Sequence, residues 1–439
     1  MSAGGIPGSQ DPRSQDPRSQ DPRSQDPRSQ DPRSQDRSEA GACVPAANAA
    51  ARRAYLDHNA TSPLKREARD AMLAALECVG NASSVHADGR AARARMEAAR
   101  AHVARLVGAA PRGVVFTSGA TEAAALALHP AVEMAGRPKP CDVLLMSVVE
   151  HPAVLRGHRF AAEAVEVLPV DGAGRVQLDA LEETLARHAA AGRRALLALM
   201  AANNETGVVQ PVAQAARLVK ARDGVVFCDA VQAAGRLPLD MAALGVDFLS
   251  LSAHKMGGPQ GTGALVAAGP DDRTPALIAG GGQERGRRAG TENGPAIAGF
   301  GAVADVARAD LAEEAARLAT LRDALERAVL AGVPDAEVIG SGAERLPNTS
   351  MLTFAGLRAE TLVIALDLAH VSVSAGSACS SGKVGASHVL SAMGVPEDRA
   401  AGAIRLSLGW SSTRQDVDEA VAALQKVVPH LRSRAVRAA

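Results

Sequence analysis

The residue best placed for chemistry in this sequence is a lysine in a glycine-rich turn. Lys255 follows the apolar run Phe248–Ser252 and precedes the loop GGPQGTG. The apolar run predicts a buried strand, and the glycines predict the turn after it. An amine that is partly desolvated there loses some preference for the charged form and can attack a carbonyl carbon. Lys255 is therefore a candidate for forming a Schiff base, although a strand-end lysine can also simply extend to water.

Other polar residues follow separate apolar runs in the same way. Asp229, His151 and Asn204 each come at or just after the end of such a run. A buried carboxylate at Asp229 suits the protonated nitrogen of a pyridine ring, which then acts as an electron sink. His151 can stack on such a ring, while Asn204 and Gln232 can bond its phenolic oxygen.

A phosphate site is predicted where an apolar strand turns into a helix. Val114–Thr117 breaks at Gly119, and a helix opens at Ala120 and Thr121. Such a start offers unpaired backbone N–H groups and a hydroxyl, although many similar turns bind nothing. Further candidates for the same phosphate are Ser252, His254 and Thr291. Together with the ring-binding residues, these are the parts of a pyridoxal phosphate site.

The elements that must position these residues alternate along the chain. Apolar runs separated by amphipathic stretches predict an α/β fold, with a mainly parallel sheet covered by helices on both faces. Ligands bind such sheets at the carboxyl ends of the strands. The predicted strands are Val114–Thr117, Val143–Val149, Ala164–Val170, Leu196–Ala201, Val225–Cys228, Phe248–Ser252 and Gly263–Ala267.

The chain is long enough for two domains, because it has 439 residues of which 47% are hydrophobic. A long helical stretch, about 295–331, leads into shorter strands and helices that predict a smaller α+β domain. Copies of QDPRS between Gln10 and Arg37 have nothing to bury and predict disorder. The predicted division is a disordered extension (1–51), an N-terminal segment that joins the small domain (52–64), a large domain (65–310) and a small C-terminal domain (311–439).

Composition excludes several classes of partner and site. Lysine plus arginine equals aspartate plus glutamate at 48 each, so neither nucleic acid nor an anionic membrane is expected as a partner. No apolar run is long enough to span a bilayer and the N-terminus lacks a signal-peptide core, so a cytoplasmic location is expected. The five cysteines contain no CxxC pair, which argues against disulfides or a structural metal site. Cys379, in a segment rich in serine and glycine, is the candidate reactive thiol.

The sequence resembles the cysteine desulfurases of the NifS/IscS type, within the class V aminotransferase-like group of fold type I pyridoxal phosphate enzymes. The matching motifs run in the family's order across about Tyr55–Gly409. They are YLDHNATSP, FTSGATEA, VEHPAV, NNETGVVQP, CDAVQAAG, SAHKMGGPQGTGAL, GGGQERGRRAGTEN, SAGSACSSGKVGASHVLSAMG and IRLSLGW. The resemblance implies a large cofactor-binding domain with a sheet of seven strands, and it favours the catalytic interpretation of Lys255.

The resemblance also implies a role for each cofactor-site residue. Lys255 forms the Schiff base and then carries protons, Asp229 pairs with the pyridine nitrogen, and His151 stacks on the ring and assists proton transfer. Thr291 reaches the phosphate of a neighbouring subunit, so a homodimer is implied. The rest of the cofactor pocket is implied to be Ala120, Thr121, Asn204, Gln232, Ser252 and His254.

For the substrate, the resemblance implies L-cysteine. Arg405, helped by Asn59, clamps the substrate carboxylate as a bidentate partner. Cys379 attacks the sulfur and carries it as a persulfide, leaving L-alanine. The sulfur then passes to an acceptor or an iron–sulfur scaffold protein.

Three alternatives remain beside a desulfurase: a selenocysteine lyase, an aminotransferase on the same scaffold, and a protein that only binds sulfur acceptors. The SAGSAC loop disfavours an aminotransferase, and intact Lys255, Asp229, His151 and Cys379 argue against a binding protein. Two features depart from the family pattern. Trp410 stands where many relatives carry arginine, and the QDPRS repeat has no counterpart.

Overall fold

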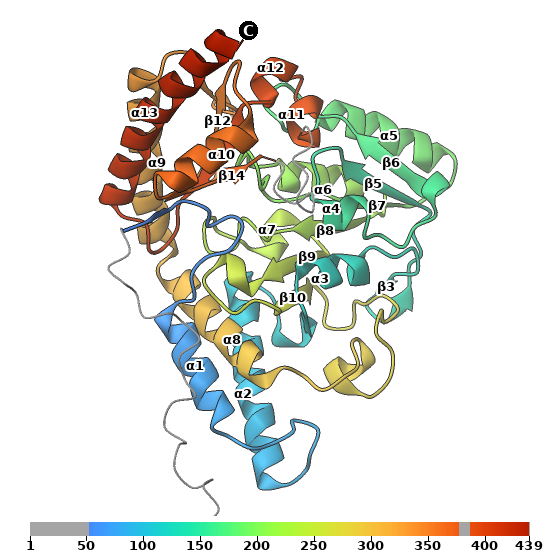
Figure 1. Cartoon of the computed structure of the whole chain (residues 1–439). Helices are drawn as coiled ribbons and strands as arrows, with labels where there is room; N and C mark the ends of the chain where they lie inside the picture. The colour runs from blue at the N-terminus through green and yellow to red at the C-terminus, as the bar shows by residue number, and fades with distance from the viewer. Residues whose placement is uncertain (1–51, 377–386, 439) are drawn as a thin grey trace, which may run out of the picture. The chain divides into compact units, whose positions relative to one another are not determined.

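The computed structural model describes residues 52–376 and 387–438, with side chains as far as residue 433 (Figure 1). The predicted extension 1–51 and the predicted nucleophile Cys379 lie outside these ranges. The described residues belong to one compact unit. Two sheets organise it, one of seven strands and one of four.

The seven-stranded sheet confirms the predicted α/β fold. Its strand order is β2-β10-β9-β8-β7-β5-β6, and β9, β8, β7, β5 and β6 are parallel. Only β10 breaks this pattern, since it runs antiparallel to both β2 and β9. The strands are β2 (Val114–Thr117), β5 (Val143–Ser147), β6 (Val165–Leu168), β7 (Ala195–Ala198), β8 (Val225–Asp229), β9 (Phe248–Ser252) and β10 (Gly263–Ala267).

Both faces of this sheet are covered by helices, which explains why its strands are mainly apolar. Successive side chains of a strand point to opposite faces. Phe227 packs with α3 and α4, whereas Cys228 packs with α2, α5, α6 and α8 on the other side. The covering helices are α1 (Arg66–Leu76), α2 (Ala87–Leu106), α3 (Ala120–Ala127), α4 (Pro152–Leu155), α5 (Leu178–Ala190), α6 (Val212–Lys220), α7 (Met241–Leu244) and α8 (Gly294–Ala309).

The four-stranded sheet is antiparallel and has its own apolar core. Its order is β11-β12-β15-β14, and Phe354 and Ile404 pack there with helices α9, α10 and α13. The N-terminal segment joins this core, because β1 pairs in parallel with β13. The elements are β1 (Ala54–Tyr55), α9 (Leu311–Gly332), β11 (Ala336–Val338), β12 (Thr349–Phe354), α10 (Ala359–Leu368), β13 (Val371–Ser372), β14 (Ser374–Ala375), β15 (Ala403–Ser407) and α13 (Arg414–Ala438). The division at residues 65 and 311 into two domains stays a prediction.

The long helical stretch predicted over 295–331 is two helices. α8 ends and α9 begins around Asp310, whose φ of −94° and ψ of 2° depart from helical geometry. An aspartate followed by Glu313 and Glu314 suits a helix start, where the dipole favours negative charge. The remaining elements are β3 (Glu133–Met134), β4 (Arg137–Pro138), α11 (His388–Ala392) and α12 (Glu397–Ala400).

The described residues contain neither a candidate membrane-spanning helix nor a candidate metal-binding cluster. None of their helices has the length and apolar character needed to cross a membrane. No cluster of histidine, cysteine, aspartate and glutamate among them is arranged to hold a metal ion.

Candidate active site

A cavity of about 500 Å³ lies at the carboxyl ends of the parallel strands. Its walls come from the turn after β2, from the ends of β5, β8 and β9, and from two distant pieces, residues 59–60 and β15. All the predicted site residues except Thr291 and Cys379 line it. The predicted residues that line it are Asn59, Ala120, Thr121, His151, Asn204, Asp229, Gln232, Ser252, His254, Lys255 and Arg405.

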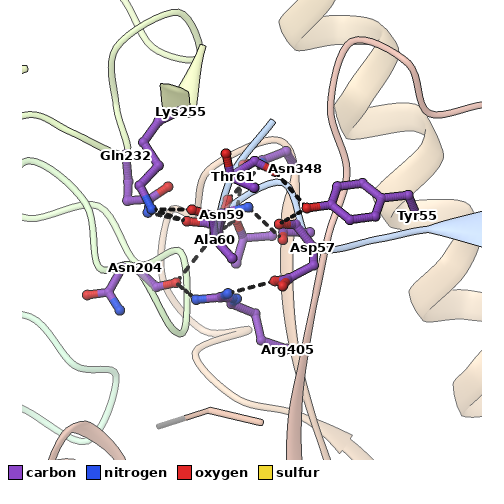
Figure 2. Close-up of polar contacts among 12 residues, drawn as sticks. Tyr55, Asp57, Asn59, Ala60, Thr61, Asn204, Gln232, Lys255, Asn348 and Arg405 are labelled. Atoms are coloured by element: carbon purple, nitrogen blue, oxygen red, sulfur yellow. Dashed lines mark hydrogen bonds and ion pairs between the residues drawn. The ribbon is translucent and has the colours of Figure 1, made fainter. Parts of the chain in front are cut away.

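Lys255 enters the cavity from a 3₁₀ turn directly after β9. Its Nζ donates to the carbonyl oxygens of Asn59, at 2.7 Å, and Ala60, at 2.8 Å (Figure 2). The start of β10 then passes against the turn after β2: a Cβ at Gly263 would lie 2.7 Å from Gly119. Only glycine permits this approach, which holds the predicted phosphate turn beside Lys255.

Asp229 ends β8 with its carboxylate fixed in one orientation. It is 8% exposed, and its Oδ1 accepts from the Val231 amide at 3.0 Å and the Ser250 hydroxyl at 3.3 Å. A carboxylate held in this way, at the lining of the cavity, can pair with a cationic ring nitrogen.

His151 caps the N-terminus of α4, which decides where its proton lies. Its Nδ1 accepts from the Ala153 amide at 3.1 Å, so the neutral ring carries its proton on Nε2. Burial lowers the pKa of His151 below its usual value; Asp229 opposes this shift, whereas Lys255 and His388 add to it. The ring is therefore neutral at pH 7, with Nε2–H as its donor.

The predicted phosphate end of the cavity combines a helix start with two side chains. α3 begins at Ala120 and no side chain caps it, so the first N–H groups of the helix have no intrahelical partner. Ser252 and His254 line the same cavity. The pKa of His254 falls to about 4 because of burial and the nearby charge of Lys255. Glu122 also lies here, but its carboxylate is paired with Arg288 at 2.9 Å.

Arg405 lines the cavity as a buried cation, 3% exposed. Its Nη2 bonds Asp57 Oδ1 at 2.9 Å and its Nη1 donates to the Asn204 carbonyl at 3.0 Å (Figure 2). Its Nε has no hydrogen-bond partner in the part of the chain that the structure describes. Asp57 and Asn204 therefore orient the guanidinium, and one buried N–H is left for a ligand.

Asn59 lines the cavity and makes several hydrogen bonds that the sequence did not predict. Its side-chain nitrogen donates to Thr349 Oγ1 at 2.9 Å and its side-chain oxygen accepts from Asn348 at 3.0 Å. Its backbone amide donates to Ser407 Oγ at 2.9 Å. The residue joins the N-terminal segment to the four-stranded sheet, and its contact with a substrate stays a prediction.

Thr291 and Cys379 are not placed in this cavity. Thr291 lines a separate cavity of about 220 Å³, together with Cys78 and Pro295. The contact of Thr291 with the phosphate of a neighbouring subunit stays a prediction. Cys379 belongs to residues 377–386, outside the described ranges.

Three residues near the site had no predicted role: Asp57, Arg236 and Glu205. Asp57 stands inside the motif YLDHNATSP, directly after the short apolar run 54–56, and an acidic residue at that point was a usable signal. Arg236 bonds both Gln232 and the Lys255 carbonyl. Glu205 Oε2 accepts from Ser387 Oγ at 2.6 Å, and burial raises the pKa of Glu205 to about 7. The contacts of Arg236 and Glu205 are seen only in the folded chain.

The chain matches known proteins along most of its length. The aminotransferase class-V family profile matches residues 54–420. A cysteine desulfurase from Cereibacter sphaeroides is 44% identical over 387 residues, which cover 87% of this chain and 97% of the relative. Among solved structures, a NifS-like protein from Rickettsia africae aligns with a TM-score of 0.77 and 32% identity, covering 86% of this chain and 99% of that one. A structure described as SspA in complex with cysteine aligns with a TM-score of 0.66 and 28% identity, covering 82% and 99%.

Proposed function

The chain belongs to the aminotransferase class-V family, and we propose that it is a cysteine desulfurase that uses pyridoxal phosphate. In this reaction L-cysteine becomes L-alanine and its sulfur passes to Cys379 as a persulfide. The sulfur then goes to iron–sulfur cluster assembly or to another sulfur-acceptor pathway. The proposal is supported by 44% identity to a relative named cysteine desulfurase.

The main support for the proposal is that Lys255, Asp229 and His151 line a single cavity. They come from the ends of three different strands, β9, β8 and β5. An amine, a fixed carboxylate and a neutral imidazole together suit a cofactor that has an aldehyde, a pyridine nitrogen and a ring face. A structural role for each residue separately would not require that they converge.

The donor set fits pyridoxal phosphate. Lys255 would hold it through its amine, Asp229 at the ring nitrogen, and Gln232 and Asn204 at the phenolic oxygen. The phosphate would lie against the start of α3 with Ser252 and His254. When bound, the cofactor supplies an electron sink for the electrons released at the α-carbon of an amino acid.

Arg405 would bind the substrate carboxylate. Its buried Nε lacks a partner among the described residues, and the guanidinium is already oriented by Asp57 and the Asn204 carbonyl. Burial strengthens such a charge-assisted pair, because water does not compete for the donors. Asn59, at the same wall, would assist through its position beside Arg405.

Protons would be moved by Lys255 and His151. Lys255 Nζ is 2.7 Å from one carbonyl oxygen and 2.8 Å from another, so its amine rests on acceptors that cannot take its proton. Its flexible side chain can leave them to exchange a proton at the substrate α-carbon. The neutral His151 carries its proton at Nε2 and can donate from there.

Sulfur transfer would use the thiolate of Cys379, whose placement lies outside the described residues. Its attack on the substrate sulfur forms an S–S bond as the C–S bond breaks. The electron pair of the C–S bond stays on carbon, which gains a proton and becomes the methyl group of alanine. A thiol reductant or an acceptor protein then removes the sulfur from Cys379.

The working form would be a cytoplasmic homodimer. Thr291 lines its own cavity and not the proposed active site of the same chain, which agrees with a contribution to a neighbouring subunit. The equal numbers of basic and acidic residues give no reason to expect attraction to an anionic membrane. Sulfur-acceptor or iron–sulfur scaffold proteins would be its protein partners.

The direct test is a purified protein supplied with pyridoxal phosphate, then with cysteine and a thiol reductant. We expect a visible cofactor absorbance, followed by sulfide and alanine in equal amounts. Cys379→Ser should keep the absorbance and lose sulfide release, whereas Cys78→Ser, an exposed thiol outside the cavity lining, should keep both. Normal turnover of Cys379→Ser would exclude the persulfide route.

A further inference from the structure

Arg236 is a buried cation behind the cavity residues Gln232 and Lys255. It is 5% exposed, and no carboxylate lies within ion-pair distance of it in residues 52–376 and 387–433. Burial, with the charge of Arg405, lowers the pKa of Arg236 to about 9. Taking an unpaired cation out of water is unfavourable unless hydrogen bonds compensate it.

The hydrogen bonds of Arg236 lead directly to the site. Its Nη1 donates to both the backbone and side-chain oxygens of Gln232, and its Nη2 donates to the Lys255 carbonyl at 3.3 Å. A guanidinium can only donate, so the side-chain atom of Gln232 that faces it must be oxygen. The Gln232 nitrogen then points the other way, where it donates to the Asn59 carbonyl at 3.1 Å.

We propose that Arg236 is a positioning residue that fixes the Gln232 amide so that its NH₂ group is presented to the cofactor. One hydrogen of that group is used by Asn59, and the other is left for the phenolic oxygen. Without Arg236 the amide can rotate by half a turn and present its oxygen, which repels an anionic phenolic oxygen. The inference rests on the proposed function, because it assigns a role toward the same cofactor.

The first experiment compares two arginines whose side-chain partners, within the described part of the chain, are all carbonyl-type oxygens. Arg159 is the control: it donates to the Leu126 and Pro275 carbonyls, at 2.9 Å each, and does not line the cavity. Arg236→Met and Arg159→Met would be loaded with pyridoxal phosphate, and the cofactor absorbance followed against pH. A donor at the phenolic oxygen favours proton loss from the conjugated system. Arg236→Met should therefore raise the absorbance midpoint by roughly one pH unit.

Cofactor affinity gives a second readout that does not depend on turnover. Loss of one well-oriented hydrogen bond should weaken binding of pyridoxal phosphate to Arg236→Met by about fivefold. Arg159→Met should keep the wild-type midpoint and affinity even if its thermal stability falls. Arg236→Lys cannot donate to Gln232 and Lys255 together, so its midpoint should be intermediate. This variant keeps the test available if Arg236→Met does not fold.

A double-mutant cycle separates positioning from a direct effect of charge. If Arg236 acts through the amide, Arg236→Met should cause no further shift in a Gln232→Leu background. An unchanged midpoint in Arg236→Met and Arg236→Lys, a full shift in the Gln232→Leu background, or an equal shift in Arg159→Met would each overturn the inference. A wild-type protein that binds no pyridoxal phosphate would instead overturn the proposed function.

Discussion

The cavity has two walls that are built in different ways. The strand-end wall, formed by His151, Asp229, Ser252 and Lys255, stands at the carboxyl ends of the parallel strands β5, β8 and β9. The segment wall, formed by Asn59, Ala60 and Arg405, combines a piece of the N-terminal segment with one residue of β15 in the four-stranded sheet. It is held by bonds between distant parts of the chain, such as Asn59 to Thr349 and Arg405 to Asp57.

Because the two walls are built differently, substitutions in the strand-end wall and in the segment wall should have different effects. A residue of the strand-end wall is positioned by its own strand, so its replacement should remove a chemical group and leave the fold intact. A residue of the segment wall is positioned by its partners and positions them in turn. Its replacement should weaken substrate binding and the contact between the N-terminal segment and the four-stranded sheet together.

The largest effect is expected from Lys255→Ala in the strand-end wall. Loss of the amine should remove the cofactor absorbance and lower kcat by roughly a thousandfold or more. Thermal unfolding of the cofactor-free protein should change little, because the Asn59 and Ala60 carbonyls that accept from the Lys255 amine line the cavity, where water can replace that amine. Lys426→Ala, at an exposed position on α13, is the control. Retained absorbance in Lys255→Ala would remove this lysine from the proposed chemistry.

The strand-end wall was the part that the sequence could predict. Each of its residues follows an apolar run, and the periodicity of those runs specifies a sheet with both faces covered. Phe248–Ser252 and Gly263–Ala267 were predicted with the bounds observed. The resemblance to desulfurases implied the role of each of these residues, and in the structure they line one cavity.

For the segment wall, the sequence identified individual residues but not the contacts that hold them in place. Arg405 and Asn59 came from motif resemblance, but their partners did not. The Arg405–Asp57 and Asn59–Asn348 contacts join residues at opposite ends of the chain, and neither end has a local pattern that specifies the pairing. Arg236 was missed although Gln232 lies only four residues earlier; its other bond, to the Lys255 carbonyl, joins two separate turns and has no local signal.

The second prediction concerns Arg405→Met in the segment wall. Loss of a bidentate partner for the substrate carboxylate should lower kcat/KM for cysteine by about a hundredfold, mainly through KM. Asp57→Asn keeps the arginine but weakens its orientation, so about tenfold is expected. Arg345→Met is the matched control, because it breaks a buried pair with Glu326 and does not line the cavity. A fall confined to kcat would place Arg405 in the chemistry instead.

The third prediction tests the pH dependence of folding at Glu205. An unfolded glutamate loses its proton near pH 4.5, whereas burial raises the pKa of folded Glu205 to about 7. Between these values the folded state binds more protons, so this carboxyl group destabilises the fold increasingly as pH rises. Relative to wild type, Glu205→Gln should gain up to about 3 kcal/mol of unfolding free energy between pH 4.5 and pH 7. Denaturant unfolding at several pH values measures it, and parallel profiles would contradict it.

The smallest effect is expected from Glu150→Gln, next to His151. Glu150 is fully buried; its Oε1 accepts from the Met200 amide at 2.8 Å, and its Oε2 lacks a partner among the described residues. Burial, with the charge of Asp229 adding to it, holds the pKa of Glu150 well above its usual range. This shift favours the neutral acid, which glutamine imitates, so kcat/KM should stay within about twofold of wild type. Asp229→Asn, which removes a charge that the proposed cofactor needs, should reduce activity far more. Equal losses in the two variants, measured by sulfide release, would show that Glu150 also acts as an anion and belongs functionally to the strand-end wall.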